Sequence, residues 1–298
     1  MKVLVTGAFG QIDALKARFP EVSFEFWQSE KESVPTPDEY DGVICNALLS
    51  LQDVTAFSHL RFVQLTAAGY DRVPLQFLTE RGVRVYNAGD AYAIPMAEAA
   101  VWGVLTLYRK GKAFIESAKR HAWEKQKGLC EMNAKRVCVV GCGNYGHACA
   151  RLFSAFGCFV TGVNRNAQKM PEFDEMFDIM RLKKALENAD IIVCALPLTE
   201  QTRGLFDKEV LAACKRGAVL VNLSRGKIVC EQDMILALQS GQLGGAVLDV
   251  FDVEPLDKDS PLWEMEQVIL TPHNAYAGDG MEKRLLDVVC RNLERELL

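Results

Sequence analysis

The sequence predicts an α/β protein built from two lobes, each with a doubly wound parallel sheet. Short apolar runs alternate with amphipathic stretches along nearly the whole chain, which is the pattern of repeated strand and helix units. The apolar runs are rich in Val, Ile, Leu and Cys and do not alternate with polar residues, as expected for strands covered by helices on both faces. With 298 residues, the chain is long enough for two domains.

The composition excludes several classes of protein. Apolar residues make up 49% of the chain and charged residues 24%, which is typical of globular proteins and excludes a disordered chain or a coiled coil. The net charge is −5 and no basic stripe is present, so we expect no nucleic-acid partner. The most apolar segment, Ala99–Tyr108, is shorter than the roughly 18–20 residues of a membrane span. The amino terminus lacks the plan of a signal peptide, and we expect no membrane association and a cytoplasmic location.

Ten cysteines are present, and no pair has C-x-x-C spacing. Most lie in apolar runs, where free cysteine behaves as a small buried hydrophobe. We therefore expect a reducing compartment, with neither a disulfide framework nor a metal site.

The first lobe is predicted to be the smaller one, with a flavodoxin-like parallel sheet. Turn residues separate its strands, as at Pro35–Asp38. Its strands are expected at Lys2–Val5, Val22–Phe26, Gly42–Asn46, Phe62–Leu65 and Val83–Tyr86, with a helix at about Gln11–Arg18.

The second lobe begins near Arg136 and repeats strand and helix more regularly, as expected of a Rossmann dinucleotide-binding sheet. Its strands are expected at Arg136–Val140, Cys158–Val163, Ile191–Ala195, Ala218–Leu223, Ala246–Val250 and Val268–Leu270. Its helices are expected at Tyr145–Phe156, Leu182–Asn188, Lys208–Cys214 and Glu231–Gln239.

Two predicted helices fit neither series. Pro95–Tyr108 is rich in apolar residues, and Asp279–Leu298 has them at helical spacing. We expect both to cross between the lobes, so that residues 1–94 and 277–298 form a substrate domain and residues 95–276 a dinucleotide-binding domain. The charged stretch Arg109–Ala134 is expected to be helical and to pack on a second subunit.

A glycine-rich turn follows the first strand of the second lobe and opens a helix. Residues Gly141–Gly146 read GCGNYG. Their glycines stand where a dinucleotide fold needs a tight turn, close approach of the pyrophosphate and close packing of the helix. The helix N-terminus then offers N–H groups to the phosphates. The alternative is a tight turn without a ligand. A rival turn, Thr6–Asp13, carries Asp13 at the third glycine position and is interpreted as an ordinary turn.

The end of the next strand indicates which dinucleotide binds. An acidic residue there accepts a hydrogen bond from the 2′-hydroxyl of NAD, whereas an arginine accommodates the 2′-phosphate of NADP. Here the strand is followed by Asn164 and Arg165, with no acid. We therefore favour NADP(H), because a guanidinium pairs well with a phosphate. NAD(H) remains possible, and the alternative for Arg165 is a solvated loop residue.

Three polar residues each follow a different predicted strand of the second lobe, and these are Arg225, Glu254 and His273. That edge is where an open α/β sheet binds its ligands. Arginine can hold the carboxylate of a 2-oxo acid and polarise its ketone. Histidine can protonate the developing alkoxide while hydride arrives from a nicotinamide, and a carboxylate beside it favours its charged form. Singly, each is more often a surface or capping residue, whereas together they predict a catalytic triad.

The same segments resemble the D-isomer-specific 2-hydroxy acid dehydrogenases, the group that includes the glyoxylate/hydroxypyruvate reductases. The resemblance covers about residues 136–275 closely. It is carried by CALPLTEQT at 194–202, VNLSRG at 221–226, DVFDVEP at 249–255, SPLW at 260–263 and ILTPH at 269–273. The first lobe matches more loosely, through TAAGYD at 66–71 and NAG at 87–89.

The resemblance implies a role for each matching residue. Arg225 would bind the substrate carboxylate and ketone, and His273, paired with Glu254, would be the acid/base. Cofactor contacts are expected from Gly141, Gly143, Asn144, Tyr145, Gly146, Asn164, Arg165, Pro197, Thr202 and Asp249, of which Asp249 would hold the nicotinamide carboxamide. Substrate contacts are expected from Ala68, Gly69, Tyr92 and Tyr276.

The expected function is therefore NADP(H)-preferring reduction of a small 2-oxo acid to a D-2-hydroxy acid by a homodimer. Asn144 and Tyr145 differ from the arginine and aliphatic residue common in the family, but the contribution of that turn is largely from its backbone. Tyr276 leaves the choice of substrate open. The alternative is a non-enzymatic dinucleotide sensor, because transcriptional corepressors share this fold and keep a similar triad.

Overall fold

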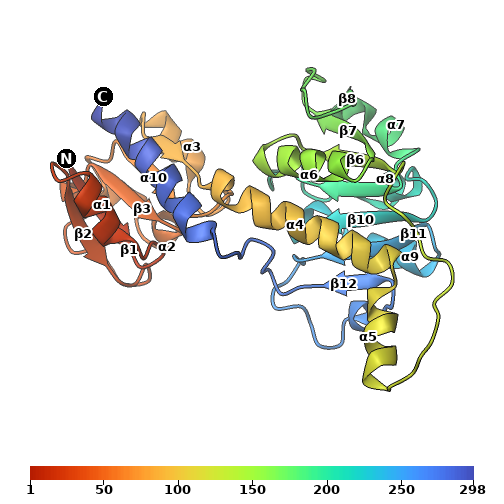
Figure 1. Ribbon diagram of the computed structural model, residues 1–298. Coiled ribbons are helices and arrows are strands. Elements are labelled where there is room, and N and C mark those ends of the chain that lie inside the picture. The colour runs from red at the N-terminus through yellow and green to blue at the C-terminus, as the bar shows by residue number, and fades with distance from the viewer. The chain divides into compact units, whose positions relative to one another are not determined.

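The computed structural model describes residues 1–298, and its contacts divide the chain into two compact units (Figure 1). Unit 1 comprises Met1–Tyr92 and Gly278–Leu298, and unit 2 comprises Ala93–Ala277. The sequence places the two boundaries after residues 94 and 276, whereas the contacts place them after residues 92 and 277. Each unit holds one parallel sheet with helices, so the predicted α/β class is confirmed.

Unit 1 is a five-stranded parallel sheet in the order β2-β1-β3-β4-β5, which is the flavodoxin-like order. Helices α1 (Ile12–Arg18) and α10 (Met281–Leu297) pack on one face, and α2 (Leu48–Leu51) and α3 (Leu75–Glu80) pack on the other. The strands are β1 (Lys2–Thr6), β2 (Ser23–Trp27), β3 (Gly42–Cys45), β4 (Phe62–Leu65) and β5 (Arg84–Tyr86).

Strand β1 shows why the apolar runs do not alternate. Val3 and Val5 lie in the core shared with α1 and α10, whereas Leu4 lies in the core on the opposite face. Successive side chains of a strand point to opposite faces, so a sheet covered on both faces needs apolar residues at every position.

Unit 2 is a seven-stranded parallel sheet in the order β12-β11-β10-β9-β6-β7-β8, which is the Rossmann order with one further strand. Helices α4 (Gly89–Tyr108) and α6 (Asn144–Ala155) pack on one face, and α7 (Leu182–Leu186), α8 (Lys208–Ala212) and α9 (Glu231–Gln239) on the other. The strands are β6 (Arg136–Val140), β7 (Phe159–Asn164), β8 (Glu175–Asp178), β9 (Ile191–Cys194), β10 (Ala218–Asn222), β11 (Leu243–Leu248) and β12 (Val268–Leu270).

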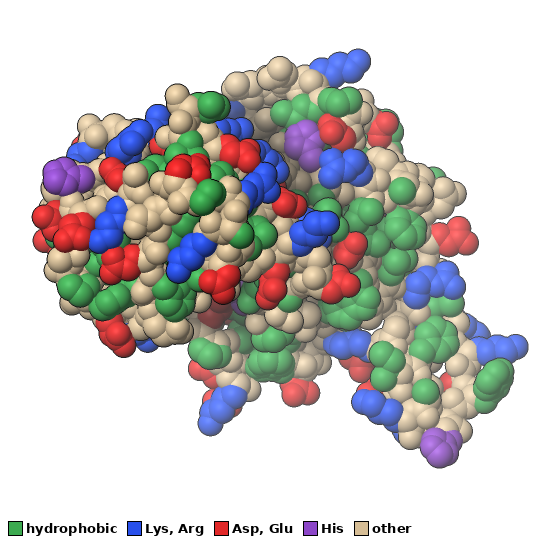
Figure 2. All heavy atoms as spheres, turned by 60° about the vertical axis from the view of Figure 1, so that its left-hand side comes forward, with side chains coloured by type: hydrophobic (Ala, Val, Ile, Leu, Met, Phe, Trp, Pro, Cys, Tyr) green, Lys and Arg blue, Asp and Glu red, His purple; other side chains and the backbone are tan.

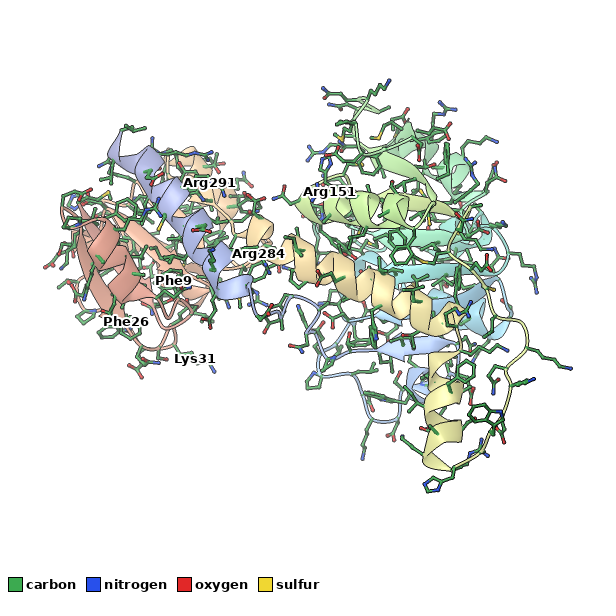
Figure 3. The ribbon with its side chains drawn as sticks, viewed as in Figure 1. Phe9, Phe26, Lys31, Arg151, Arg284 and Arg291 are labelled. Carbon is green, nitrogen blue, oxygen red and sulfur yellow. The ribbon has the colours of Figure 1, made fainter.

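Helix α4 begins at Gly89, earlier than the predicted start at Pro95, which lies inside the helix. Proline has no N–H group, so it leaves the carbonyl of Ala91, four residues back, without its helical partner. The Arg284 side chain of α10 (Figure 3) donates to that carbonyl, with Nε 2.9 Å from the oxygen. A residue far away in the sequence thus removes the usual penalty of an internal proline.

By length and composition alone, the 20 residues of α4 could cross a membrane. Core helices of globular proteins pass the same test, and 44% of its apolar stretch is buried inside the protein. Ala93, Ala97, Ala100 and Val104 are among the buried residues and pack in the core of unit 2.

The helix predicted over Arg109–Ala134 is wrong for most of its length. Only α5 (Gly111–Lys119) is helical, and His121 then takes a left-handed conformation with φ 56°. The Ala122 N–H donates to the Ser117 carbonyl at 2.9 Å, which closes the helix as a Schellman motif. Glycine usually occupies that left-handed position, and a histidine there gives no sequence signal.

Strand β8 was not predicted. Its four residues read Glu-Met-Phe-Asp, and it pairs only with β7 at the edge of the sheet. An edge strand with acidic residues at both ends lacks the continuous apolar run that indicates a central strand.

Candidate active site

The predicted site residues of unit 2 follow strands whose ends are aligned. One row of residues, paired in register across six strands, lies near the carboxyl ends of these strands. The row consists of Val163, Val140, Cys194, Asn222, Leu248 and Leu270. The parallel pairing therefore brings the glycine turn, Arg225, Glu254 and His273 to one edge of the sheet, where α/β folds bind their ligands.

Each glycine of the turn after β6 has a distinct steric environment. Gly141 has φ 108°, and a Cβ there would lie 2.3 Å from the Ala195 carbonyl oxygen. A Cβ on Gly146 would lie 2.0 Å from the Gly141 carbonyl oxygen, so only glycine lets α6 pack this closely on the turn. At Gly143 no atom lies within 4 Å of the Cβ position. That open space fits the backbone approach of a dinucleotide pyrophosphate.

The N-terminus of α6 supplies the donors. Gly143 is the N-cap and has no side chain to occupy the free N–H groups of the first turn. The Tyr145 ring packs against the core and its hydroxyl oxygen is buried, with burial raising the pKa of the phenol well above its usual value. Tyr145 therefore presents its backbone to this edge. The turn and the helix end together fit a dinucleotide.

Asn164 and Arg165 lie at the end of β7, beside the glycine turn. The Asn164 side-chain oxygen accepts a hydrogen bond from the Arg165 N–H at 2.8 Å, which turns the chain out of the strand. The Arg165 side chain is exposed. Neither residue is acidic. Arg165 follows β7, which pairs directly with β6, the strand that leads into the glycine turn.

His273 and Glu254 form a close pair. His273 Nδ1 lies 2.6 Å from Glu254 Oε2, and the two side chains are 34% and 36% exposed. A carboxylate only accepts hydrogen bonds, so Nδ1 carries the hydrogen and Nε2 is left for a ligand. The other carboxylate oxygen of Glu254 accepts from the Phe251 N–H at 3.1 Å, which orients the acid.

A buried carboxylate, that of Asp249, holds the loop that carries His273. It accepts hydrogen bonds from the Thr271 hydroxyl at 2.6 Å, the Asn274 N–H at 2.8 Å and the Ala275 N–H at 2.9 Å. The His273 N–H donates to the Asp249 carbonyl at 2.8 Å. Asp249 therefore has a positioning role that the sequence analysis did not assign to it.

Arg225 is positioned by the loop after β10. The Asn222 side chain donates to the Arg225 carbonyl at 3.0 Å, and the Arg225 guanidinium donates to the Ser224 carbonyl at 2.9 Å. A Cβ at Gly226 would lie 2.0 Å from the Phe251 carbonyl oxygen. The loops that carry Arg225 and Glu254 are therefore packed directly against each other.

A cavity of about 610 Å³ opens beside the His273–Glu254 pair. Apart from these two side chains its walls are mainly apolar. They are formed by Phe251, Pro255, Leu256, Trp263, Leu270, Thr271 and Pro272. The pair thus lies at the border of an apolar surface, where a charge is less screened than in water.

Several other predicted residues support loops. The Thr202 hydroxyl donates to the Pro197 carbonyl at 2.6 Å and closes the loop after β9. In unit 1, Ala68 and Gly69 follow β4, and the Tyr92 hydroxyl donates to the Thr66 carbonyl two residues before Ala68. Tyr276 is 42% exposed.

The rival turn after β1 differs from the glycine turn in its packing. Its Phe9 side chain (labelled in Figure 3) is 1% exposed and packs in the core of unit 1. The helix that follows, α1, has only seven residues.

The sequence analysis missed the residues that position the triad. Asn222, Ser224 and Thr271 all lie inside the motifs that carry the resemblance. The side chains of Asn222 and Ser224 bond within the loop that carries Arg225, and the Thr271 side chain bonds to the Asp249 carboxylate. A polar residue placed directly after a buried strand was the available signal.

The comparisons with known proteins agree with this geometry. A family model described as D-isomer specific 2-hydroxyacid dehydrogenase, NAD binding domain, matches residues 101–275. The chain is 32% identical over 277 residues to a glyoxylate/hydroxypyruvate reductase of Arabidopsis thaliana, covering 90% of this chain and 87% of that protein. It is 30% identical over 312 aligned residues to a glyoxylate reductase of Pyrococcus furiosus, covering 98% and 91%. A solved D-isomer specific 2-hydroxyacid dehydrogenase of Xanthobacter autotrophicus, in complex with NADPH and MES, matches with a TM-score of 0.79 and 28% identity, covering 99% and 95%.

The steric environments of Gly143 and Gly146 predict that one substitution weakens dinucleotide binding and the other lowers thermal stability. Gly143→Ala should leave thermal stability unchanged, because its Cβ meets no protein atom, but should weaken dinucleotide binding at least about tenfold by blocking the pyrophosphate. Gly146→Ala should lower the melting temperature, because its Cβ would clash with the Gly141 carbonyl. Calorimetry and fluorescence titration measure both. Equal dinucleotide affinity of wild type and Gly143→Ala would contradict the assigned site.

Proposed function

Because this chain belongs to the D-isomer specific 2-hydroxyacid dehydrogenase family and is an NAD(P)-dependent oxidoreductase, we propose that it reduces a small 2-oxo acid to the D-2-hydroxy acid, with NADPH as the preferred cofactor. The observation that carries the proposal is the His273–Glu254 pair, at 2.6 Å, on the sheet edge that holds the glycine turn. Glyoxylate and hydroxypyruvate, named for the relatives, are the first candidate substrates. Relatives that are reductases favour an enzyme over a dinucleotide sensor.

His273 acts as the acid in reduction and as the base in the reverse direction. Its Nδ1–H is held by Glu254, so Nε2 faces the substrate oxygen and gives up a proton as the alkoxide develops. The Glu254 carboxylate stabilises the charged imidazolium and fixes the ring orientation. Both groups stay in place between turnovers because backbone bonds hold their loops.

Arg225 binds the substrate in this proposal. A guanidinium offers a planar fork of donors that can hold the carboxylate of a 2-oxo acid and polarise the neighbouring ketone. The loop contacts of Arg225 fix its backbone before substrate arrives, which reduces the ordering cost of binding.

The cofactor is held by this chain through three features. The glycine turn and the N-terminus of α6 bind the pyrophosphate, and Asp249 binds the carboxamide with its remaining acceptor capacity. Arg165 pairs with the 2′-phosphate, which is why we propose NADPH over NADH. When bound, the nicotinamide supplies the hydride that reduces the ketone.

Substitutions of the acid test the mechanism. His273→Asn should lower kcat for NADPH-dependent glyoxylate or hydroxypyruvate reduction by about 10²–10⁴-fold, because the proton donor is lost. Glu254→Gln should lower it less, since the imidazole remains but loses its partner. His121→Asn, which changes a histidine in the segment after α5, is the control and should keep full activity. Initial rates at saturating cofactor measure this, and a His273→Asn rate within a few-fold of wild type would exclude the assigned role.

The cofactor preference is tested separately at Arg165. Arg165→Gln should raise KM for NADPH by about tenfold or more, because a charge-assisted phosphate contact is lost, and should change KM for NADH little. Arg181→Gln removes another exposed arginine, the residue just before α7, and should change neither value. A parallel rise of both KM values in Arg165→Gln would contradict a role at the 2′-phosphate.

We also propose that two copies of the chain associate through a face formed by α4, α5 and α6. This face exposes large apolar side chains, among them Trp102 at 52%, Ile115 at 57% and Phe156 at 43%. Over α5, at the lower right of Figure 2, hydrophobic side chains lie at the surface among lysines and arginines. Exposed apolar groups in such number mark an association surface.

Light scattering tests this association. The wild type should have the mass of two chains, and Trp102→Glu should shift the equilibrium to one chain, because a charge would be buried at the centre of the face. A monomeric wild type at micromolar concentration would contradict the proposal.

A further inference from the structure

The loop that carries Arg165 returns to the nucleotide-binding helix through an acidic residue. Glu172 lies near the end of the segment between β7 and β8. One of its carboxylate oxygens lies 3.1 Å from His147 Nδ1, and the other lies 4.0 Å from Arg151 Nη1. His147 and Arg151 are four residues apart on α6 and therefore share one face of that helix (Arg151 is labelled in Figure 3).

The contact between Glu172 and His147 differs from the surface ion pairs of the chain. The two side chains are 25% and 27% exposed, and the facing atoms, Oε2 and Nδ1, are themselves buried and make no hydrogen bond within the chain, so each is the nearest polar group of the other. Buried polar atoms gain little from leaving water unless they meet each other. Separating the pair would leave both atoms without a polar neighbour, so the 3.1 Å contact favours keeping this end of the loop at α6.

The next residue fixes the same end of the loop by packing. Phe173 is 5% exposed, and its ring lies edge-on to the His147 ring with 5.7 Å between centroids. A Cβ placed on Gly162 would lie 2.8 Å from Phe173 and 3.0 Å from the Cys142 sulfur of the glycine turn. The end of the loop thus packs against α6 and against the turn that binds the pyrophosphate.

The beginning of the loop is fixed as well. The Asn164 side chain accepts from the Arg165 N–H, and Ala167 takes a left-handed conformation with φ 47°. The segment is therefore held at Asn164 and at Glu172. If the contacts of Glu172 with α6 were lost, the residues between these two ends would be less restricted in conformation. Arg165 lies at the near end of that segment.

We propose that Glu172, together with His147 and Arg151, forms a clasp that positions the Arg165 loop for the 2′-phosphate of NADPH. In this proposal the three residues are positioning residues for cofactor specificity. The inference rests on the proposed NADPH preference and adds three residues that join the Arg165 loop to helix α6. It assigns the function of an otherwise unexplained buried pair to the adenosine end of the cofactor.

Two effects of Glu172 on NADPH binding oppose each other. Its negative charge repels a phosphate, whereas its contacts with α6 hold the loop that presents Arg165. The Arg151 guanidinium balances that charge at 4.0 Å, and solvent ions screen what remains over about 8–10 Å. The positioning effect should therefore dominate.

The test is Glu172→Gln in the full-length protein, with KM and kcat measured for NADPH and NADH on one 2-oxo acid. KM for NADPH should rise about three- to tenfold, while KM for NADH and kcat stay within about twofold. His147→Gln should give a similar change, and the double variant should be no worse than either single one, because the pair acts as a unit.

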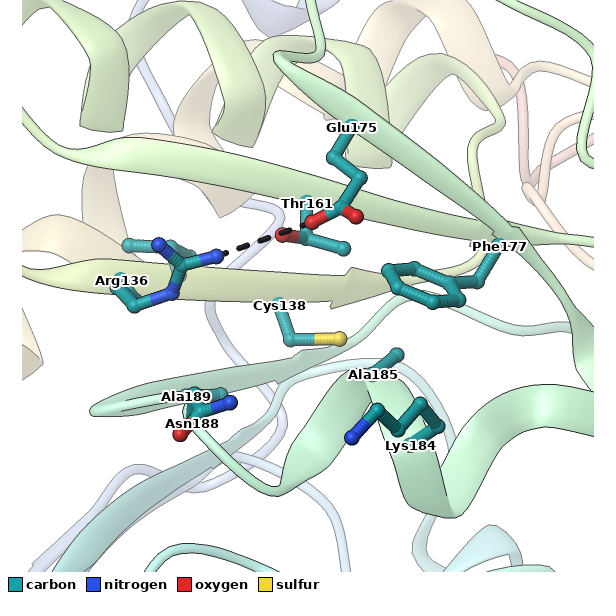
Figure 4. Close-up of a pocket in the computed structure, with 10 residues that line it drawn as sticks. Arg136, Cys138, Thr161, Glu175, Phe177, Lys184, Ala185, Asn188 and Ala189 are labelled. Atoms are coloured by element: carbon teal, nitrogen blue, oxygen red, sulfur yellow. Dashed lines mark ion pairs between the residues drawn. The ribbon is translucent and has the colours of Figure 1, made fainter.

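Glu175→Gln is the matched control. It makes the same charge change three residues further along the chain, where the Glu175 carboxylate lies 3.7 Å from the Arg136 guanidinium. Both side chains line a separate cavity of about 200 Å³, which lies toward the amino-terminal ends of β6 and β7 and not at the carboxyl ends that carry the glycine turn and Arg165 (Figure 4). Both cofactor KM values should be unchanged in this variant, because the pair does not contact the Arg165 loop.

Amide hydrogen exchange separates the clasp from the cofactor preference. Residues 165–173 should exchange faster in Glu172→Gln than in wild type or Glu175→Gln, whichever cofactor the enzyme prefers. A wild type without NADPH preference would refute that part of the proposed function and leave the exchange test standing. Unchanged exchange, a parallel rise of both KM values, or tighter NADPH binding in Glu172→Gln would each overturn the clasp.

Discussion

The buried carboxylate of Asp249 is the interaction on which the rest of the site depends. It is 1% exposed, and a carboxylate removed from water costs several kcal/mol unless hydrogen bonds replace its hydration. Those bonds come from the Thr271 hydroxyl and from the backbone N–H groups of Asn274 and Ala275. Satisfying the carboxylate therefore folds the loop after β12 over the end of β11, and this places His273 in a left-handed conformation, φ 50°, with its ring against Glu254.

The other loops depend on the same close packing at the strand ends. Gly226 brings the Arg225 loop onto the Phe251 carbonyl, and the Phe251 N–H in turn orients Glu254. The parallel register fixes where these loops start, and glycine permits their close approach. The proposed catalytic groups thus lie on short segments between rigid strands, whereas the loop that carries Arg165, which we propose binds the cofactor, is longer and has its own attachment to α6.

Site residues that a local sequence pattern marks could be predicted from the sequence. The glycine turn after β6 has a steric signature at each glycine, and each side chain of the proposed triad follows an apolar strand. Structure decided by distant partners could not be predicted in this way. Pro95 is accepted inside α4 because Arg284, far along the chain, bonds the carbonyl that the proline leaves free. His121 ends α5 although glycine is the usual residue there, and β8 forms at a sheet edge without an apolar run. The positioning role of Asp249 needed the geometry as well, because sequence cannot show which N–H groups face a carboxylate.

The measurement that tests this account most directly is amide hydrogen exchange of residues 271–275 in Asp249→Asn, combined with kcat and dinucleotide affinity. An amide at this position keeps one acceptor oxygen, but its NH₂ group would face at least one of the donors that the second carboxylate oxygen or its partner now satisfies, so it cannot replace the carboxylate. The account predicts faster exchange across the loop and a kcat about 100-fold lower with NADPH and with NADH alike, because His273 is no longer positioned. Unchanged exchange, with a loss confined to dinucleotide affinity, would show that Asp249 only binds the cofactor and would contradict the account.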